Sequence, residues 1–299
     1  MTPELEHDHS PAPAAALPAS VRLGTVHLSV SDLDRSVAWW GDVAGLTTRE
    51  HGASVAALGA GGEDLIVLHE QPGAQPGGRH AGLFHVALLH DSDAELGHAL
   101  RRIAASGARL EGASDHGVSK ALYLRDPDHH GLEIYADRPR AEWPAGSGGE
   151  RVGMFTAPLD LDAVLAPVAG EDPRPRSGPG LSVGHVHLHV GDLARAAAFY
   201  RDALGLELMA RYPGAEFLAA GGYHHHLALN TWAGEGVAPA PATAARLLRW
   251  TIVLPDADAV AAAGERLRAH GAAVDQADDG LVVRDPWEIE LLLTASARA

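Results

Sequence analysis

The sequence contains no cysteine, very little lysine and few aromatic residues. Lys120 is the only lysine, and 5% of the 299 residues are aromatic. Without a thiol the chain cannot form disulfides, iron–sulfur clusters, cysteine-ligated zinc sites or a cysteine nucleophile, so a metal would need nitrogen and oxygen ligands. Basic residues are also scarce, with 23 Lys and Arg against 39 Asp and Glu, a formal net charge of −16. This balance argues against nucleic-acid or anionic-lipid partners and leaves 19 histidines as candidate ligands.

Long apolar runs are missing as well. No stretch reaches the roughly 18 apolar residues that a membrane span requires. Residues 1–20 begin with acidic residues and continue through Pro and Ala, without the basic segment and apolar core of a signal peptide. We therefore expect a cytoplasmic protein with no membrane partner and with a disordered tail over residues 1–20. His7 and His9 lie in that tail and are not expected to build a metal site.

An internal repeat organises the rest of the chain, which at 46% hydrophobic residues can form real cores. The C-terminal half repeats the N-terminal half, and each half contains a second repeat. The matching segments are residues 24–33 with 184–193, 84–91 with 249–256, and the Arg-Asp-Pro motif at 125–127 with that at 284–286. The chain therefore consists of four related modules.

Each module reads as an alternating strand, an amphipathic helix and then strands separated by glycines, which predicts an α+β fold of four βαβββ units. The module bounds are 21–70, 80–137, 181–233 and 246–295. Modules 1 and 2 form an N-terminal half (21–137), and modules 3 and 4 form a C-terminal half (181–295). A linker rich in Pro, Gly and acidic residues (138–180) joins them and is predicted to contain a short helix over residues 160–165.

Local signals refine this pattern. Ser31 is expected to cap the first helix, and longer helices are predicted over residues 93–106 and 257–270. His129 and His130 follow an Asp-Pro-Asp turn and are expected to be exposed.

Three histidines alternate along the first strand of module 3. Because His185, His187 and His189 are spaced by two, their side chains share one face of a strand. The position of His185 is occupied by Thr25 in module 1. The alternative is a purely structural role, in which some of these rings face solvent or are hydrogen-bonded inside a barrel.

Module 2 carries two further candidates. His85 lies on its first strand, where module 4 has Trp250, and Glu133 lies on its last strand between Leu132 and Ile134. The Glu133 carboxylate therefore points away from the apolar face. If it faces a barrel interior it needs a partner such as a metal ion, because an unpaired buried charge is very costly. An exposed carboxylate on an edge strand is the alternative.

In order and in register with the fourfold repeat, several segments resemble the vicinal oxygen chelate superfamily of glyoxalases and extradiol dioxygenases. The likeness covers residues 21–295 and is to the two-domain catechol 2,3-dioxygenase branch. The segments are residues 183–200, 82–87 (GLFHVA), 116–123 (HGVSKALY) running into Asp126, Pro127 and Glu133, and 221–230 (GGYHHHLALN). The resemblance implies that paired modules curl into two open, incompletely closed β-barrels.

The resemblance also implies a ligand set of His85, His185 and Glu133. Two histidines and a carboxylate form the facial triad of non-haem Fe(II) oxygenases, which leaves positions for a bidentate substrate and dioxygen. Fe(II) is thus the expected cofactor, with Mn(II) as the alternative. All three ligands fall in one barrel only if modules 2 and 3 pair, leaving modules 1 and 4, with Thr25 and Trp250, as a barrel without metal. We expect this pairing.

The resemblance also implies roles for residues around the metal, by their positions in the matching segments. His225 matches the acid–base histidine of the family, although strand register leaves His224 and His226 open. Tyr123 matches a hydrogen-bonding tyrosine and His116 a substrate-side histidine, with a shorter gap between them than the family shows. The residues expected to contact the substrate are His187, His226 and Asn230.

The resemblance therefore implies an Fe(II)-dependent extradiol dioxygenase acting on a catechol-type diol and dioxygen. One alternative is a glyoxalase-like isomerase, lyase or thiol transferase, which would usually place a further carboxylate where this chain reads His-His-His-Leu-Ala-Leu. A second alternative is a binding or sequestration protein without metal, which would not need three compatible ligands. A homo-oligomer is the default expectation.

Overall fold

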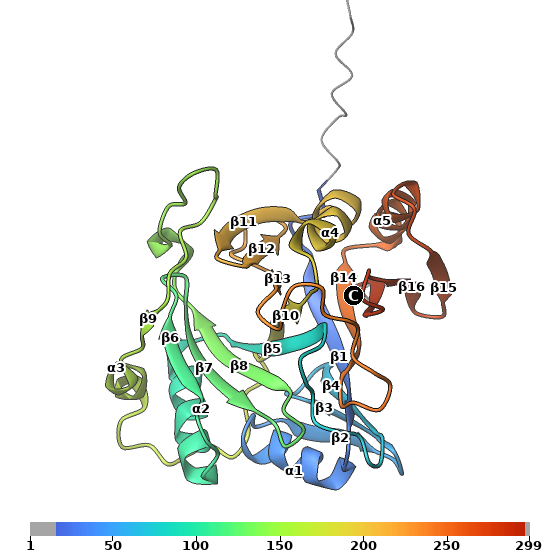
Figure 1. Cartoon of the computed structure of the whole chain (residues 1–299). Helices are drawn as coiled ribbons and strands as arrows, with labels where there is room; N and C mark the ends of the chain where they lie inside the picture. The colour runs from blue at the N-terminus through green and yellow to red at the C-terminus, as the bar shows by residue number, and fades with distance from the viewer. Residues whose placement is uncertain (1–15, 297–299) are drawn as a thin grey trace, which may run out of the picture.

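Two curled sheets stand side by side in the computed structural model, which describes residues 16–296 (Figure 1). The eight-stranded sheet has the order β15 (Val274–Ala277), β16 (Gly280–Arg284), β17 (Glu290–Ala295), β14 (Leu247–Leu254), β1 (Arg22–Val30), β4 (Asp64–Glu70), β3 (Val55–Gly59), β2 (Thr47–His51). The nine-stranded sheet has the order β11 (Glu207–Tyr212), β12 (Ala215–Ala219), β13 (Leu227–Asn230), β10 (Ser182–His189), β5 (Gly82–His90), β8 (Gly131–Asp137), β7 (Ser119–Arg125), β6 (Gly112–Asp115), β9 (Ala157–Pro158).

Each sheet takes one module from each half of the chain. β1 of module 1 pairs antiparallel with β14 of module 4, and β10 of module 3 pairs antiparallel with β5 of module 2. Modules 1 and 4 thus build the eight-stranded sheet, and modules 2 and 3 build the nine-stranded one. The predicted α+β fold of two open, curled sheets is confirmed, and within it His85, Glu133 and His185 belong to one sheet.

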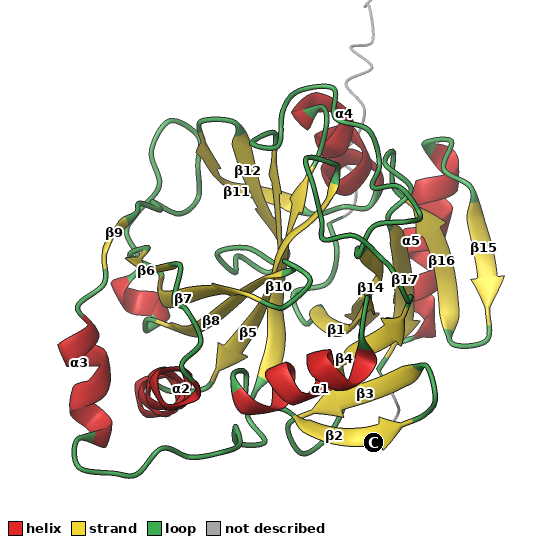
Figure 2. Ribbon diagram, turned by 60° about the horizontal axis from the view of Figure 1, so that its bottom comes forward, coloured by secondary structure: helices red, strands yellow, loops and turns green. Residues whose placement is uncertain are grey.

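The helices lie on the outer faces of the sheets (Figure 2). They are α1 (Leu33–Asp42), α2 (Asp93–Ser106), η1 (Arg140–Glu142), α3 (Leu161–Leu165), η2 (Ala166–Val168), α4 (Leu193–Ala197), the π-helical η3 (Ala198–Ala203) and α5 (Ala257–Ala269). The predicted helices over residues 93–106, 160–165 and 257–270 are confirmed to within one residue at each end. The Ser31 cap is wrong by one position: the Asp32 carboxylate accepts from the Arg35 amide over 2.9 Å. None of the described helices is long and apolar enough to cross a membrane.

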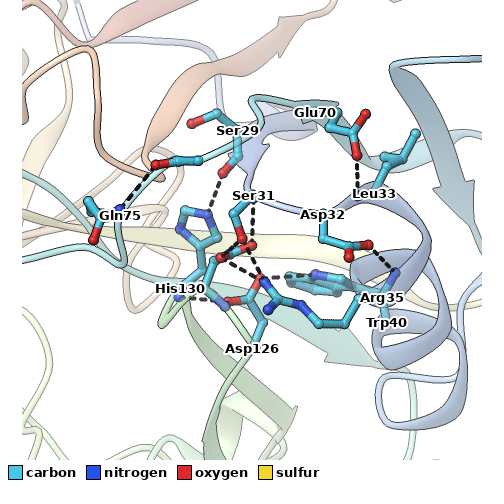
Figure 3. Close-up of polar contacts among 12 residues, drawn as sticks. Ser29, Ser31, Asp32, Leu33, Arg35, Trp40, Glu70, Gln75, Asp126 and His130 are labelled. Carbon is cyan, nitrogen blue, oxygen red and sulfur yellow. Dashed lines mark hydrogen bonds and ion pairs between the residues drawn. The ribbon is translucent and has the colours of Figure 1, made fainter.

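Each of the two Arg-Asp-Pro turns forms a hydrogen bond to another module through its aspartate. After β7, the Asp126 carboxylate accepts from the indole of Trp40 on α1 over 3.3 Å (Figure 3). After β16, the Asp285 carboxylate accepts from the hydroxyl of Tyr200 in η3 over 2.9 Å. Each turn of one sheet is thus hydrogen-bonded to an aromatic residue in the helical segment of a module from the other sheet.

One expectation about the first Arg-Asp-Pro turn is wrong. His130 is buried, not exposed, and its Nε2 donates to the Ser29 carbonyl over 2.9 Å (Figure 3). The neighbouring Asp128 carboxylate accepts from the Ser31 hydroxyl over 2.6 Å. Ser31 therefore binds the turn that contains Asp128 instead of capping the helix. His129 is exposed, as predicted.

One apolar core extends through both sheets. The tail predicted over residues 1–20, with His7 and His9, lies largely outside the described residues. Within its described end, Leu17 is buried and its amide donates to the Gly205 carbonyl over 2.8 Å.

Candidate metal centre

Three buried side chains of the nine-stranded sheet converge on one point. His85 Nε2 lies 3.0 Å and His185 Nε2 3.1 Å from the same oxygen of Glu133, Oε2. The two imidazole nitrogens are 3.3 Å apart. The side chains come from β5, β10 and β8, far apart in the sequence, so the sheet order brings them together.

Strand register explains this convergence. His185 of β10 lies opposite Ala87 of β5, Ala87 lies opposite Glu133 of β8, and Glu133 lies opposite Tyr123 of β7. Side chains in one such row project from the same face of a sheet. Ala87 is the small member of the row, so its methyl group leaves space between the imidazole and the carboxylate. His85 lies in the next row, opposite His187.

The electrostatics favour a neutral His185 ring beside an ionised Glu133 carboxylate. Burial lowers the pKa of His185 to about 4, despite the opposing effect of Glu133. Burial alone would raise the pKa of Glu133, but the rings of His185 and His85 outweigh it and hold this pKa well below its usual range. Neutral imidazole and ionised carboxylate are the protonation states in which these groups bind a metal ion.

The donor set fits a divalent transition metal. Two imidazole nitrogens and one carboxylate oxygen are suited to Fe(II) or Mn(II). A cation would also neutralise the Glu133 carboxylate, whose charge is costly to bury without a partner. Among residues 16–296 this is the one group of three His or acidic side chains whose donor atoms converge, and no second carboxylate joins it.

The eight-stranded sheet is built differently at the matching positions. The Thr25 hydroxyl donates to the Asp64 carbonyl over 2.7 Å, and Trp250 is fully buried. Glu290, on the last strand of module 4, pairs with Arg249 over 2.5 Å and with Arg284 over 2.6 Å. The carboxylate is thus neutralised by guanidinium groups instead of facing histidines.

The three adjacent histidines before β13 have different surroundings. His225 lines the cavity, and its ring centroid lies 4.0 Å from that of His185. His224 lies behind it, with Nε2 donating to Asp137 Oδ1 over 2.8 Å and Nδ1 lying 2.8 Å from His225 Nδ1. His226 Nδ1 accepts from the Ala220 amide over 3.3 Å, and its ring packs on Tyr223.

The Asp137 carboxylate sets the proton positions in this row. It can only accept, so His224 Nε2 carries a hydrogen and, with both rings neutral, His224 Nδ1 accepts from His225 Nδ1. His225 Nε2 is then the atom with a free lone pair. Burial, followed by the nearby His185, holds the pKa of His225 well below its usual range. His225 is therefore built as a neutral proton acceptor.

His116 and Tyr123 form a second hydrogen-bonded pair at the cavity. His116 Nδ1 donates to the Phe155 carbonyl over 2.9 Å, so the neutral ring accepts the Tyr123 hydroxyl proton at Nε2 over 2.7 Å. Burial and then the Glu133 carboxylate raise the pKa of Tyr123 well above its usual range. Tyr123 thus keeps its proton and directs it toward His116.

His187 also reaches the cavity, whereas Asn230 and His226 are not among the residues that line it. The Asn230 oxygen accepts from the Trp232 amide over 2.9 Å, so its Nδ2 donates to His187 Nε2 over 2.8 Å. Asn230 therefore orients His187 from behind. His226 lies in the wall near Tyr223. The structure thus places two of the three residues predicted to contact the substrate behind the cavity surface.

The cavity has a volume of about 270 Å³, with Glu133 and His85 at its inner end. Its walls include residues that the repeat could not reveal. Met154, Phe155 and Thr156 come from the linker, and further lining residues are Phe84, Phe217 and Trp232. The linker lies outside the four modules, so their alignment carries no information about its position.

Comparison with known proteins agrees with this architecture. The family model described as the glyoxalase/bleomycin resistance protein/dioxygenase superfamily matches residues 22–134 and 182–291. A catechol-2,3-dioxygenase of Bacillus subtilis (strain 168) is 38% identical over 269 residues, covering 88% of this chain and 93% of that protein. A solved Bacillus subtilis structure assigned as a dioxygenase has a TM-score of 0.66 at 14% identity and covers 95% of this chain and 87% of its own. Glyoxalase I from Zea mays has a TM-score of 0.55 at 18% identity and 92% coverage of both chains. The chain belongs to the glyoxalase/bleomycin resistance protein/dioxygenase superfamily.

Proposed function

We propose that this protein is an extradiol dioxygenase that uses Fe(II) to open the ring of a catechol-type diol beside its hydroxyl groups. The observation that carries the proposal is the convergence of His85, His185 and Glu133, of which His85 and Glu133 line an aromatic cavity. Similarity to a catechol-2,3-dioxygenase over 88% of the chain supports the same reaction class.

His85, His185 and Glu133 would hold the ion, which when bound offers positions for the two substrate oxygens and for dioxygen. His225 would take a proton from a substrate hydroxyl at Nε2, since Asp137 and His224 leave that atom with a lone pair. It would return the proton as the ring opens, and such transfers typically contribute about 10²–10⁴-fold to the rate.

The other groups would position the ring and keep water away. Tyr123 and His116, joined by a hydrogen bond, line the cavity, and so does His187, which is held by Asn230. Phe84 supplies an apolar wall next to His85 and His187. A planar diol would thus meet polar groups at its hydroxyl edge and aromatic faces elsewhere.

The test is oxygen uptake by protein purified anaerobically and loaded with ferrous iron, supplied with unsubstituted, alkyl and chloro catechols and with hydroquinones. We expect uptake with at least one catechol and a yellow ring-opened semialdehyde. His225→Asn should lower kcat by about 10²–10⁴-fold while bound iron is retained. The matched control His51→Asn, at an exposed histidine of β2, should behave as wild type. Stoichiometric iron without uptake on any diol would refute the proposal.

A further inference from the structure

Large apolar side chains are exposed at the open end of the cavity. Across the described residues, exposed large hydrophobics are Val55 at 39%, Phe155 at 47%, Tyr212 at 51% and Trp232 at 46%. Three of these four, Phe155, Tyr212 and Trp232, line the cavity that contains Glu133. They come from the linker, the end of β11 and the residues after β13, and we call them the aromatic rim. Chance exposure of single apolar residues would not gather them at one opening.

Two members of the rim, Trp232 and Phe155, are held in place by the residues around them. The Trp232 indole donates to the Pro213 carbonyl over 3.0 Å, and its ring meets Phe84 edge-on with centroids 5.5 Å apart. The Phe155 ring packs against Gly117, where an added Cβ would lie 2.5 Å from the ring. Fixed aromatic faces bind an apolar group with little loss of conformational entropy.

The rim also extends the inner apolar wall without a break. Phe84 contacts both His85 at the inner end and Trp232 at the rim, with ring centroids 5.0 and 5.5 Å apart. Phe217 packs against His225 with centroids 5.0 Å apart. A group attached to a ring held near His85 therefore meets aromatic carbon as it extends outward.

Charge at the opening disfavours an anionic group. Arg211 is the only Lys or Arg that lines the cavity, and its guanidinium pairs with Glu216 over 3.3 Å. Its backbone amide binds the Glu150 carboxylate over 3.0 Å. The Arg211 guanidinium is thus already paired within the protein, so a carboxylate on the substrate would find no unpaired Lys or Arg among the residues that line the cavity.

We propose that the aromatic rim is an outer subsite for an uncharged, apolar substituent, so that the preferred substrates are ring diols carrying an alkyl or aryl side chain and not carboxylated ones. This inference rests on the proposed function. Each methylene that the rim covers should improve kcat/KM by roughly three- to fourfold. The unsubstituted and carboxylated catechols should be the poorer substrates.

The experiment compares catechol, 4-methylcatechol, 4-butylcatechol and 3,4-dihydroxybenzoate on the iron-loaded enzyme. The readout is the ratio of kcat/KM for butylcatechol to that for catechol, which we expect to exceed about tenfold in wild type. Phe155→Ala and Tyr212→Ala should each lower the ratio several-fold. Val55→Ala, the exposed apolar residue of β3 outside the cavity, should leave it unchanged.

Anaerobic calorimetry with the same ligands keeps the inference separate from the proposed function. If no diol is turned over but butylcatechol binds more tightly than dihydroxybenzoate, and Phe155→Ala abolishes this preference, the subsite stands and the reaction assignment fails. A flat or carboxylate-favouring series in wild type would overturn the subsite, as would rim variants that leave the ratio and the binding preference unchanged.

Discussion

His224, His225 and His226 are adjacent in sequence but differ in what they touch. They precede β13, which begins at Leu227, so the alternation of a regular strand does not say which ring faces the cavity. His85, Glu133 and His185, in contrast, lie within regular strands. For those residues the period of two and the repeat alignment indicated candidates, and the resemblance to the vicinal oxygen chelate superfamily grouped them as one ligand set.

A substitution at Asp137 tests the orientation of His224 and His225 without removing a metal ligand. In Asp137→Asn the amide oxygen can still accept from His224 Nε2, but the negative charge that favours this arrangement is lost. We expect kcat to fall at least tenfold, with KM and bound iron near wild type, as measured by oxygen uptake and metal analysis.

The control is Asp93→Asn, which removes a carboxylate paired with Lys120 at the surface. It should leave kcat unchanged. Equal kcat for Asp137→Asn and wild type would show that the hydrogen-bonded row of Asp137, His224 and His225 has no role in turnover.

At the scale of elements, the same turn is used twice to join one sheet to the helices of the other. The repeated Arg-Asp-Pro motif was visible in the sequence. The hydrogen bonds that its aspartates accept, from Trp40 to Asp126 and from Tyr200 to Asp285, were not, because a contact between modules leaves no period in the chain. The burial of His130 was missed for the same reason.

Asp285 makes this joint sensitive to pH. Burial raises its pKa from the ordinary 3.8 to about 6, so the native state binds this proton more tightly than the unfolded chain does. The free energy of unfolding should therefore fall as pH rises from about 4 to about 6, by up to about 3 kcal/mol, and stay lower above.

Asp285→Asn should remove that dependence. The amide oxygen can still accept from the Trp287 and Ile289 amides, which bind Oδ1 over 2.8 and 2.9 Å. Urea unfolding at several pH values should show the variant at least as stable as wild type above pH 7. Asp172→Asn, at an exposed linker position, should keep the wild-type profile. If the stability of Asp285→Asn still falls between pH 4 and 6, the effect belongs to another group.

At the scale of the whole molecule, two related sheets have diverged in chemistry. Their strand order mixes the halves of the chain, which places the converging donors in the nine-stranded sheet and an arginine-paired Glu290 in the other. The fourfold repeat predicted the modules, and ligand counting favoured this pairing. The linker's contribution to the cavity could not be predicted, since its residues match no other segment.

Iron content tests the central claim most directly. We expect wild-type protein loaded anaerobically to hold about one iron per chain, and His85→Ala, Glu133→Ala and His185→Ala each to lose it while remaining folded by circular dichroism. His27→Ala, which alters a histidine of the eight-stranded sheet that hydrogen-bonds His69, should retain it. Two irons per chain, or a His185→Ala protein that binds iron as wild type does, would contradict the account.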